Sequence, residues 1–173
     1  MKPLLALLMA LLTACSDGQS TSGPKPDADA QRLAPTAQPR IALTGRVTDA
    51  ADILDAAQEA RLSKSLEQLE RTRGHQMVVV TVPTLRGQEV AAYTRDLGNA
   101  WGIGRDEEDD GVILLVAPNE RLARIAVGDG LEKKLPDVLC QRIMDEQVVP
   151  RFREGDLPGG IEAAVSAIIG RLA

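Results

Sequence analysis

The chain has 173 residues, of which 44% are hydrophobic and 26% are charged, and its formal net charge is −5. An acidic chain without a basic cluster is a poor partner for nucleic acid. Its single tryptophan, tyrosine and phenylalanine are too few to build a stacking platform for bases.

The sequence begins with a short apolar segment that is typical of a secretory signal. Lys2 precedes apolar residues 4–12, and Leu12-Thr13-Ala14-Cys15 resembles a bacterial lipobox, at which cleavage leaves a lipid-modified cysteine. The segment is too short to cross a bilayer, which takes about 20 apolar residues, whereas its charge, length and small residues fit a signal peptide. We expect residues 1–14 to be removed and Cys15 to be acylated. The alternative is an uncleaved helix with a chance cysteine.

An acylated Cys15 would determine where the protein works, because two or more acyl chains anchor a protein stably to a membrane. We expect a chain outside the cytoplasm, lipid-anchored to the cell envelope, and on the periplasmic face of the outer membrane if the source is Gram-negative. Residues 15–43 combine low hydrophobicity with several prolines, which predicts a disordered tether. The remaining residues, 44–173, are enough for one folded domain.

Hydrophobic periodicity divides the domain into helices and strands. In chain order, the prediction is a helix at 55–73, a strand at 76–82, a helix at 88–101, strands at 111–117 and 121–127 joined by a turn near Asn119, and helices at 135–153 and 158–172. The first two strands are continuous apolar runs, as expected for strands covered on both faces in a parallel sheet. The sequence therefore predicts an α/β fold, a three-layer sandwich whose small mixed β-sheet has helices on both faces.

Acidic residues flank the predicted hairpin at its open end. Residues 106–110 are five consecutive acids before one strand, and Gly128-Asp129-Gly130-Leu131-Glu132 follows the next. A hairpin centred near Asn119 would place Asp110 opposite Gly128 and so bring the two loops together. Converging carboxylate and carbonyl oxygens suit a hard cation such as calcium. The alternative is a solvated acidic loop, as most charge runs are.

Four motifs in order resemble the TPM domain, a family named after a thylakoid lumen protein, a photosystem repair protein and a nematode receptor auxiliary protein. The motifs are Thr48-Asp49-Ala50-Ala51-Asp52-Ile53-Leu54, Trp101-Gly102-Ile103-Gly104, Asp109-Asp110-Gly111-Val112-Ile113-Leu114-Leu115-Val116 and Val127-Gly128-Asp129-Gly130-Leu131-Glu132. Residues 150–156 also look like the family's late helix end, and the resemblance extends from Gly45 to Ala173.

The resemblance implies an α/β sandwich in an extracytoplasmic compartment. Some members bind calcium near these loops, others assist the repair or assembly of membrane complexes, and acid phosphatase activity has been attributed to some plant members. Carried over to this sequence, the resemblance implies a composite calcium site. Its candidate ligands are Asp49, Asp52, Asp109, Asp110 and Glu132.

The sequence offers little machinery for phosphatase chemistry. A cysteine phosphatase needs an arginine six residues after its nucleophile, but Glu146 stands there after Cys140. The only histidine is His75, which we interpret as a surface or boundary residue. Metal-assisted hydrolysis remains, with Asp49, Asp109 or Asp110 as nucleophile or base.

We therefore predict a calcium-binding accessory domain for the assembly or maintenance of envelope proteins, with the membrane and an unknown envelope protein as partners. The alternative is a weak metal-dependent acid phosphatase.

Overall fold

The computed structural model describes residues 41–105 and 107–173. The predicted signal peptide, Cys15 and nearly all of the predicted tether lie outside the described residues. Within the described part of the chain, no helix is both long and apolar enough to cross a membrane.

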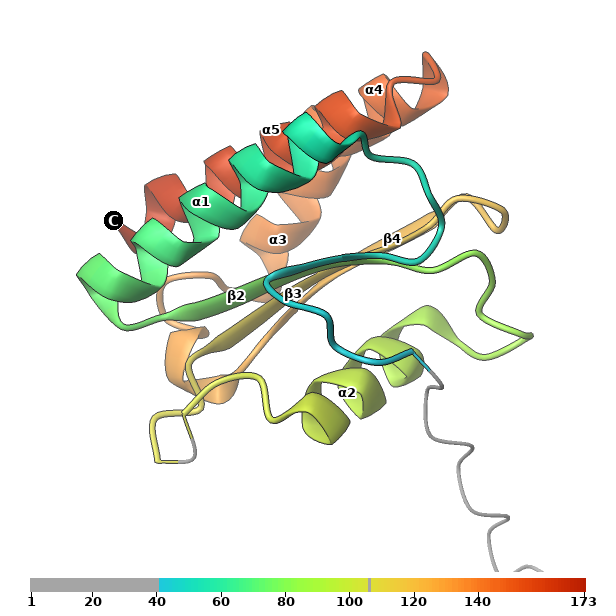
Figure 1. Ribbon diagram of the computed structural model, residues 1–173. Helices are drawn as coiled ribbons and strands as arrows, with labels where there is room; N and C mark the ends of the chain where they lie inside the picture. The colour runs from blue at the N-terminus through green and yellow to red at the C-terminus, as the bar shows by residue number, and fades with distance from the viewer. Residues whose placement is uncertain (1–40, 106) are drawn as a thin grey trace, which may run out of the picture. The chain divides into compact units, whose positions relative to one another are not determined.

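A four-stranded sheet forms the centre of the domain, with its strands in the order β1-β2-β3-β4 (Figure 1). Its strands are β1 (Val47–Asp49), β2 (Gln76–Thr81), β3 (Gly111–Ala117) and β4 (Leu122–Val127). The strands β1, β2 and β3 are parallel, whereas β4 is antiparallel to β3. The sheet is therefore mixed, as predicted, and β4 is one of its edges.

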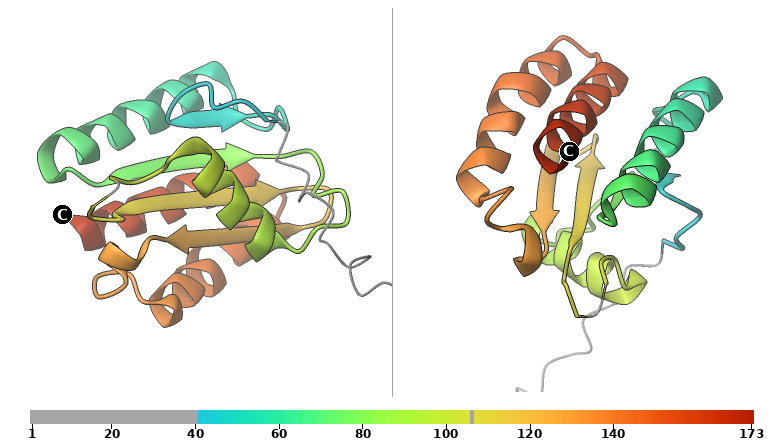
Figure 2. Two further views of the ribbon diagram at one scale, coloured as in Figure 1. Left: turned by 90° about the horizontal axis from the view of Figure 1, so that it is seen from below. Right: turned by 90° about the vertical axis from the view of Figure 1, so that its left-hand side faces the viewer.

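Helices cover both faces of this sheet (Figure 2). They are α1 (Ala56–Arg73), α2 (Val90–Trp101), the 3-10 helix η1 (Asp129–Leu131), α3 (Asp137–Ile143), the π-helix η2 (Met144–Val148), α4 (Val149–Arg153) and α5 (Leu157–Leu172). One core joins α1, α3, η2 and α5 to side chains such as Val79 and Leu114. The other core joins α2 to Val80 and Leu115. Because alternate residues of each strand enter opposite cores, the three-layer sandwich is confirmed.

The caps of α1 explain why the predicted helix at 55–73 forms. The Asp55 side chain accepts a hydrogen bond from Gln58 N–H, and the Gln58 side chain accepts one from Asp55 N–H. This capping box satisfies two otherwise unpaired donors. Gly74 ends the helix at a φ of 79°, a conformation that glycine adopts without steric cost.

Three details differ from the sequence prediction. The strand β1 was not predicted, because it is only three residues long. The predicted helix at 135–153 contains a π turn at Met144–Val148, which ends two positions before Pro150. A proline lacks an N–H and its ring collides with the carbonyl four residues earlier, so a wider turn accommodates it.

The third difference is the register of the hairpin. Val112 is level with Val127, and Gly128 N–H donates to the Gly111 carbonyl oxygen at 2.9 Å. Asp110 is consequently level with Asp129 and not with Gly128. The prediction was wrong by one residue, because the turn occupies four residues between Ala117 and Leu122 and not three.

The two helical crossovers of the parallel strands have opposite hands. The strands β1, β2 and β3 are added in one direction across the sheet, yet α1 and α2 cover opposite faces. Two right-handed crossovers in one direction would place both helices on the same face. As a result, α1 shares its face of the sheet with α3, η2 and α5, whereas α2 covers the other face.

Candidate functional site

The five predicted calcium ligands lie at two opposite ends of the sheet. Asp49 ends β1 and is level with Thr81, at the end of β2. Asp110 precedes β3 by one residue, which places it level with His75, just before β2 begins. Six residues separate His75 from Thr81, which corresponds to about 20 Å along a strand. Asp49 and Asp110 therefore cannot bind one ion together, and the predicted composite site is corrected on this point.

The Asp49 carboxylate holds the loop between β1 and α1. Its Oδ2 accepts hydrogen bonds from the backbone N–H groups of Ile53 and Leu54, at 2.9 and 2.8 Å. Its Oδ1 accepts a hydrogen bond from the Thr81 hydroxyl. Asp52, in the same loop, is exposed and has a φ of 55°. The loop is thus folded around Asp49 and fixed to the end of β2.

At the other end of the sheet, the acidic loop before β3 packs on the loop after β4. Asp129 N–H donates to Asp109 Oδ2 at 3.1 Å, and Gly130 N–H donates to the Asp109 carbonyl oxygen at 3.1 Å. A Cβ atom at Gly128 would overlap the Asp109 carbonyl oxygen, so the backbones meet too closely for a side chain. The predicted convergence of these two loops is confirmed. Glu132 follows the second loop and is exposed.

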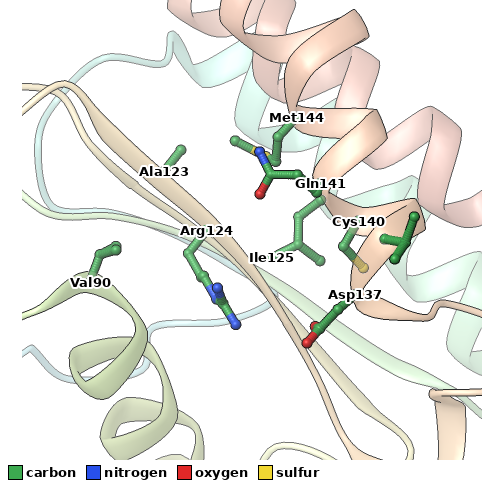
Figure 3. Close-up of a pocket in the computed structure, with 9 residues that line it drawn as sticks. Val90, Ala123, Arg124, Ile125, Asp137, Cys140, Gln141 and Met144 are labelled. Carbon is green, nitrogen blue, oxygen red and sulfur yellow. The ribbon is translucent and has the colours of Figure 1, made fainter.

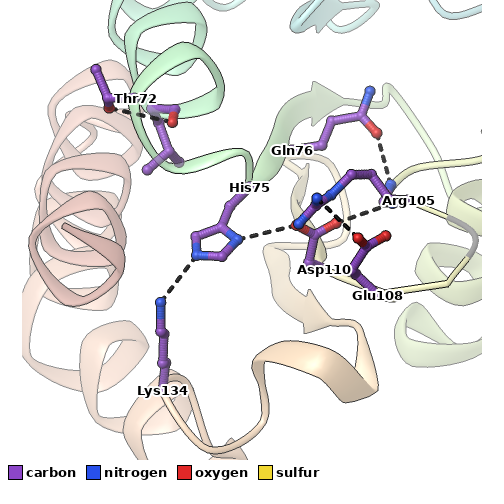
Figure 4. Close-up of polar contacts among 9 residues, drawn as sticks. Thr72, His75, Gln76, Arg105, Glu108, Asp110 and Lys134 are labelled. Atoms are coloured by element: carbon purple, nitrogen blue, oxygen red, sulfur yellow. Dashed lines mark hydrogen bonds and ion pairs between the residues drawn. The ribbon is translucent and has the colours of Figure 1, made fainter.

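Asp110 is the centre of a polar network that joins three segments (Figure 4). Its side chain is only 3% exposed. Arg105 Nη2 donates to Asp110 Oδ2 at 2.6 Å, and Arg105 N–H donates to Oδ1 at 3.0 Å. His75 Nδ1 lies 3.1 Å from the same Oδ2. A buried carboxylate with this many donors is held in its charged form.

The balance of these effects lowers the pKa of Asp110. Burial, the largest single effect, raises the pKa of this carboxyl group. The side-chain and backbone hydrogen bonds from Arg105, together with the hydrogen bond from His75, outweigh burial and bring the pKa well below its usual value. Asp110 therefore stays ionised across the whole neutral range and does not act there as a proton donor.

The partners of His75 fix its tautomer. An ionised Asp110 only accepts, so Nδ1 carries the proton, and Lys134 Nζ only donates, so Nε2 accepts from it at 3.1 Å. The His75 side chain is 13% exposed, which places this residue at the boundary of the core, as predicted. Both ring nitrogens are engaged, so the histidine connects the start of β2 to the segment after η1.

Sequence reasoning missed this network, although a signal for it existed. His75 directly precedes one predicted strand, and Asp110 directly precedes the next. Residues at the starts of neighbouring parallel strands lie at the same end of the sheet. Arg105 and Lys134 could not be found in this way, because both lie in loops whose path the sequence does not determine.

Two further acidic residues also hold loops or helix ends. Glu89 caps α2, with its oxygens accepting from Ala91 N–H and Ala92 N–H. Glu120, in the turn between β3 and β4, accepts from the Thr84 hydroxyl and from Leu85 N–H. These hydrogen bonds lower the pKa of both carboxyl groups. Structural use of acidic side chains is therefore a general property of the domain.

The described residues do not fit a ready metal site. Within residues 41–105 and 107–173, no group of three or more histidine, cysteine, aspartate or glutamate side chains is arranged to hold an ion. Asp110 is occupied by Arg105 and His75, and Asp49 is occupied by its own loop. Of the predicted ligands, Asp109 and Glu132 remain exposed at one end of the sheet and Asp52 at the other.

Comparisons with known proteins agree on the fold. A family model described as the TPM domain matches residues 47–171. The N-terminal domain of a protein from P. gingivalis (target PgR37A) has 32% sequence identity and a TM-score of 0.70, covering 75% of this chain and 82% of that one. No curated protein matches.

Two other solved structures share the fold at lower identity. The N-terminal domain of cg2496 from Corynebacterium glutamicum is 17% identical with a TM-score of 0.60, covering 82% of this chain and 86% of that one. The BA42 protein from Bizionia argentinensis is 16% identical with a TM-score of 0.62, covering 70% and 83%. The order of strands and helices described above is thus shared with proteins of distant sequence.

Proposed function

Because the chain belongs to the TPM domain family, we propose that it is a lipid-tethered, extracytoplasmic binding domain that assists the assembly or maintenance of other envelope proteins. In this proposal it catalyses no reaction of its own. The membrane tether is the acylated Cys15, and the domain from residue 44 onward makes contact with the partner.

One observation carries the non-catalytic part of the proposal: two of the three candidate nucleophiles or bases, Asp49 and Asp110, already accept several hydrogen bonds from the protein itself. Asp49 accepts from two backbone N–H groups and a hydroxyl, and Asp110 accepts from Arg105 and His75. Both nitrogens of His75 are engaged. A catalytic base or nucleophile needs an unoccupied lone pair directed at the substrate.

Calcium binding stays a prediction and is not needed for this role. The two ends of the sheet cannot share one ion, so an ion at the acidic loops would retain only Asp109 and Glu132 of the predicted side-chain ligands. The alternative of a metal-dependent phosphatase gains no support from the geometry, since Asp49 and Asp110 are occupied by hydrogen bonds and lie at opposite ends of the sheet.

Cell fractionation tests the tether directly. The full chain and a Cys15→Ser variant would be expressed in a bacterial host and separated into cytoplasmic, soluble extracytoplasmic and membrane fractions. We expect the parent in the membrane fraction and Cys15→Ser in the soluble extracytoplasmic fraction. Cys140→Ser is the matched control, because it removes the other cysteine and should leave membrane attachment unchanged. Membrane attachment of Cys15→Ser, or a cytoplasmic location of the parent, would contradict the proposal.

Chemical cross-linking in intact cells tests the accessory role. We expect adducts between the parent chain and envelope proteins, and we expect Cys140→Ser to form the same adducts. Cys15→Ser should lose them, because the domain no longer remains near the membrane. Adducts that are identical in all three strains, or confined to cytoplasmic proteins, would contradict a role at the envelope.

A further inference from the structure

The outer edge of β4 carries backbone groups that have no strand beside them. Gly128 N–H donates to the Gly111 carbonyl oxygen, so the even-numbered residues of β4 hydrogen-bond with β3. The odd-numbered residues alternate with them and direct their N–H and C=O groups away from the sheet. These residues are Ala123, Ile125 and Val127.

Within the described part of the chain, none of these three residues forms a backbone hydrogen bond on its outer side. Ile125 is only 3% exposed, whereas Ala123 and Val127 on either side of it are partly exposed. A backbone N–H or C=O group is unfavourable where it has no protein partner and water cannot fully replace one. A strand that pairs with this edge would therefore gain more binding free energy than a strand that pairs with an edge fully open to water.

A groove of about 500 Å³ runs along this edge between two helices (Figure 3). Val90 of α2 lines one side, and Asp137 and Cys140 of α3 line the other. Residues 123–125 of β4 also line the groove, and no residue of β3 does. Val138 is 73% exposed and lines the groove as well. The groove thus has a strand edge and apolar side chains, which is what an added strand requires.

The groove is lined by one arginine, Arg124, and one aspartate, Asp137, and an adjoining hollow adds two arginines, although the whole chain has a formal net charge of −5. A neighbouring hollow of about 770 Å³ shares Ala123 with the groove and extends it past the start of β4. The ionisable residues lining the two hollows are Arg121, Arg124, Arg153 and Asp137, apart from the Cys140 thiol. None of the three arginines has an ion-pair partner among residues 41–105 and 107–173.

Arg124 gives the strongest indication of the chemical group that this groove would bind. Its Nε is buried and has no hydrogen-bond acceptor among the described residues. Glu89, which directly precedes α2, is already occupied in capping that helix through Ala91 N–H and Ala92 N–H. A carboxylate supplied from outside would satisfy the Arg124 guanidinium.

We propose that the outer edge of β4 binds an extended, acidic segment of a partner protein, which pairs with Ala123, Ile125 and Val127 as a fifth strand and directs a carboxylate at Arg124. This inference rests on the proposed function and names the chemistry of the partner. A second copy of this chain fits less well. A symmetric antiparallel pairing centred on Ile125 would place both Arg124 side chains on one face of the joined sheet, where like charges repel.

Amide hydrogen exchange measured by NMR on the full-length chain in detergent tests the pairing residue by residue. The probe is an eight-residue peptide that alternates valine with polar residues and has two central glutamates; its control has lysines in their place. We expect exchange at Ala123, Ile125 and Val127 to slow at least tenfold with the glutamate peptide. The even-numbered amides of β4, already bonded to β3, should change little. The lysine peptide should bind at least tenfold more weakly.

Two variants connect binding to the residues in the argument. Arg124→Glu should reverse the preference between the two peptides, whereas Arg73→Glu makes the same charge change on α1, away from the groove, and should not. Ala123→Pro removes one outward N–H without removing a bond to β3, so it should weaken binding of the glutamate peptide. Thermal unfolding of each variant verifies that it folds. If Ala123→Pro does not fold, the result with Arg124→Glu decides the test.

Several results would overturn this inference. These are no binding at millimolar peptide, equal binding of the two peptides, or binding without slower exchange at the three odd-numbered amides. Slower exchange that depends on protein concentration alone would assign the edge to a second copy instead. None of these results bears on membrane attachment or on cross-linking to envelope proteins, so this inference can fail while the proposed function stands.

Discussion

The Asp110 carboxylate is 3% exposed and receives hydrogen bonds from a guanidinium, an imidazole and a backbone amide. Removing its charge would leave Arg105 and His75 without the acceptor around which they are arranged. The residue precedes β3 directly, so its contacts determine how the loop at 105–110 enters the sheet. For this reason we expect substitution of Asp110 to change the stability of the folded domain.

Replacing Asp110 with asparagine should lower the free energy of unfolding by about 2 kcal/mol at pH 7, because hydrogen bonds between charged groups are lost in a buried position. The measurement is urea unfolding followed by circular dichroism. Asp52→Asn is the matched control, since Asp52 is exposed and its side chain has no hydrogen bond among the described residues. It should change stability by less than about 0.5 kcal/mol. Equal effects of the two substitutions would contradict a structural role for Asp110.

The difference in stability between the parent protein and Asp110→Asn has a defined pH dependence. The pKa of Asp110 is lowered in the folded state, so its contribution is complete above the unfolded pKa of about 4 and is lost as the pH falls below it. Between pH 4 and pH 2.5 the parent should therefore lose stability faster than Asp110→Asn does. Parallel stability curves for the two proteins over this range would show that Asp110 is not responsible.

Cys140 should be chemically inert in the folded protein. Burial and, to a lesser degree, the nearby Asp137 raise the pKa of its thiol to about 11, with Arg124 acting in the opposite direction. Few thiolates are then present at pH 8, and the thiolate is the reactive form. In a Cys15→Ser background, we expect alkylation by iodoacetamide to be at least a hundredfold slower than in urea. A similar rate under both conditions would contradict this prediction.

The elements around the acidic loops depend on glycines where two backbones touch. A Cβ atom at Gly130 would overlap the carbonyl oxygen of Glu108, so that alanine there must push the two loops apart. We expect Gly130→Ala to lower the free energy of unfolding by about 1–3 kcal/mol. In α5, a Cβ atom at Gly170 would meet no other atom within 4 Å, and Gly170→Ala should raise stability by about 0.5–1 kcal/mol. Urea unfolding of both variants measures the contrast, and equal changes would contradict it.

Most elements could be predicted from hydrophobic periodicity because each buries a regular stripe or a continuous run. The helix at 55–73 and the strands at 76–82 and 111–117 lie within one or two residues of α1, β2 and β3. The strand β1 could not be found, since three residues carry no measurable period. The opposite hands of the crossovers were also beyond prediction, because they depend on which face each helix covers.

The candidate site was less predictable than the fold. Local sequence placed Asp109 and Asp110 at the hairpin's open end, since antiparallel pairing brings those loops together. It could not place Asp49, because the end of the sheet on which Asp49 lies depends on β1, which was not recognised as a strand. Family resemblance assembled five acidic residues into one site, whereas three parallel strands separate them into two groups.

At the scale of the whole molecule, this separation means that one calcium ion cannot use both groups of acidic residues, and the prediction is narrowed to the acidic loops at one end of the sheet. If calcium binds the acidic loops with a dissociation constant of about 1 mM, then 10 mM calcium stabilises the folded state by about 1.4 kcal/mol. We expect a corresponding rise in melting temperature, which Asp109→Asn removes and Asp52→Asn retains. Magnesium at equal ionic strength is the control. The calcium prediction fails if the melting temperature does not rise, or if Asp52→Asn abolishes the rise.

The domain as a whole uses acidic side chains at the sheet ends to hold loops: Asp49 and Asp110 are occupied by contacts within the chain. In our proposal, the outer edge of β4 is the surface that receives a partner. A tethered protein built in this way would act by binding its neighbours, and its acidic residues would matter for folding.

Turnover of a generic phosphoester by the full-length chain tests this account most directly. The assay would be run at pH 5 and pH 7 with calcium, with magnesium and with neither, and it would include Asp109→Asn as a variant that retains the Asp110 network. We predict no turnover above the buffer background under any condition. Robust metal-dependent turnover that Asp109→Asn abolishes, with the variant still folded, would contradict the account and establish the domain as an enzyme.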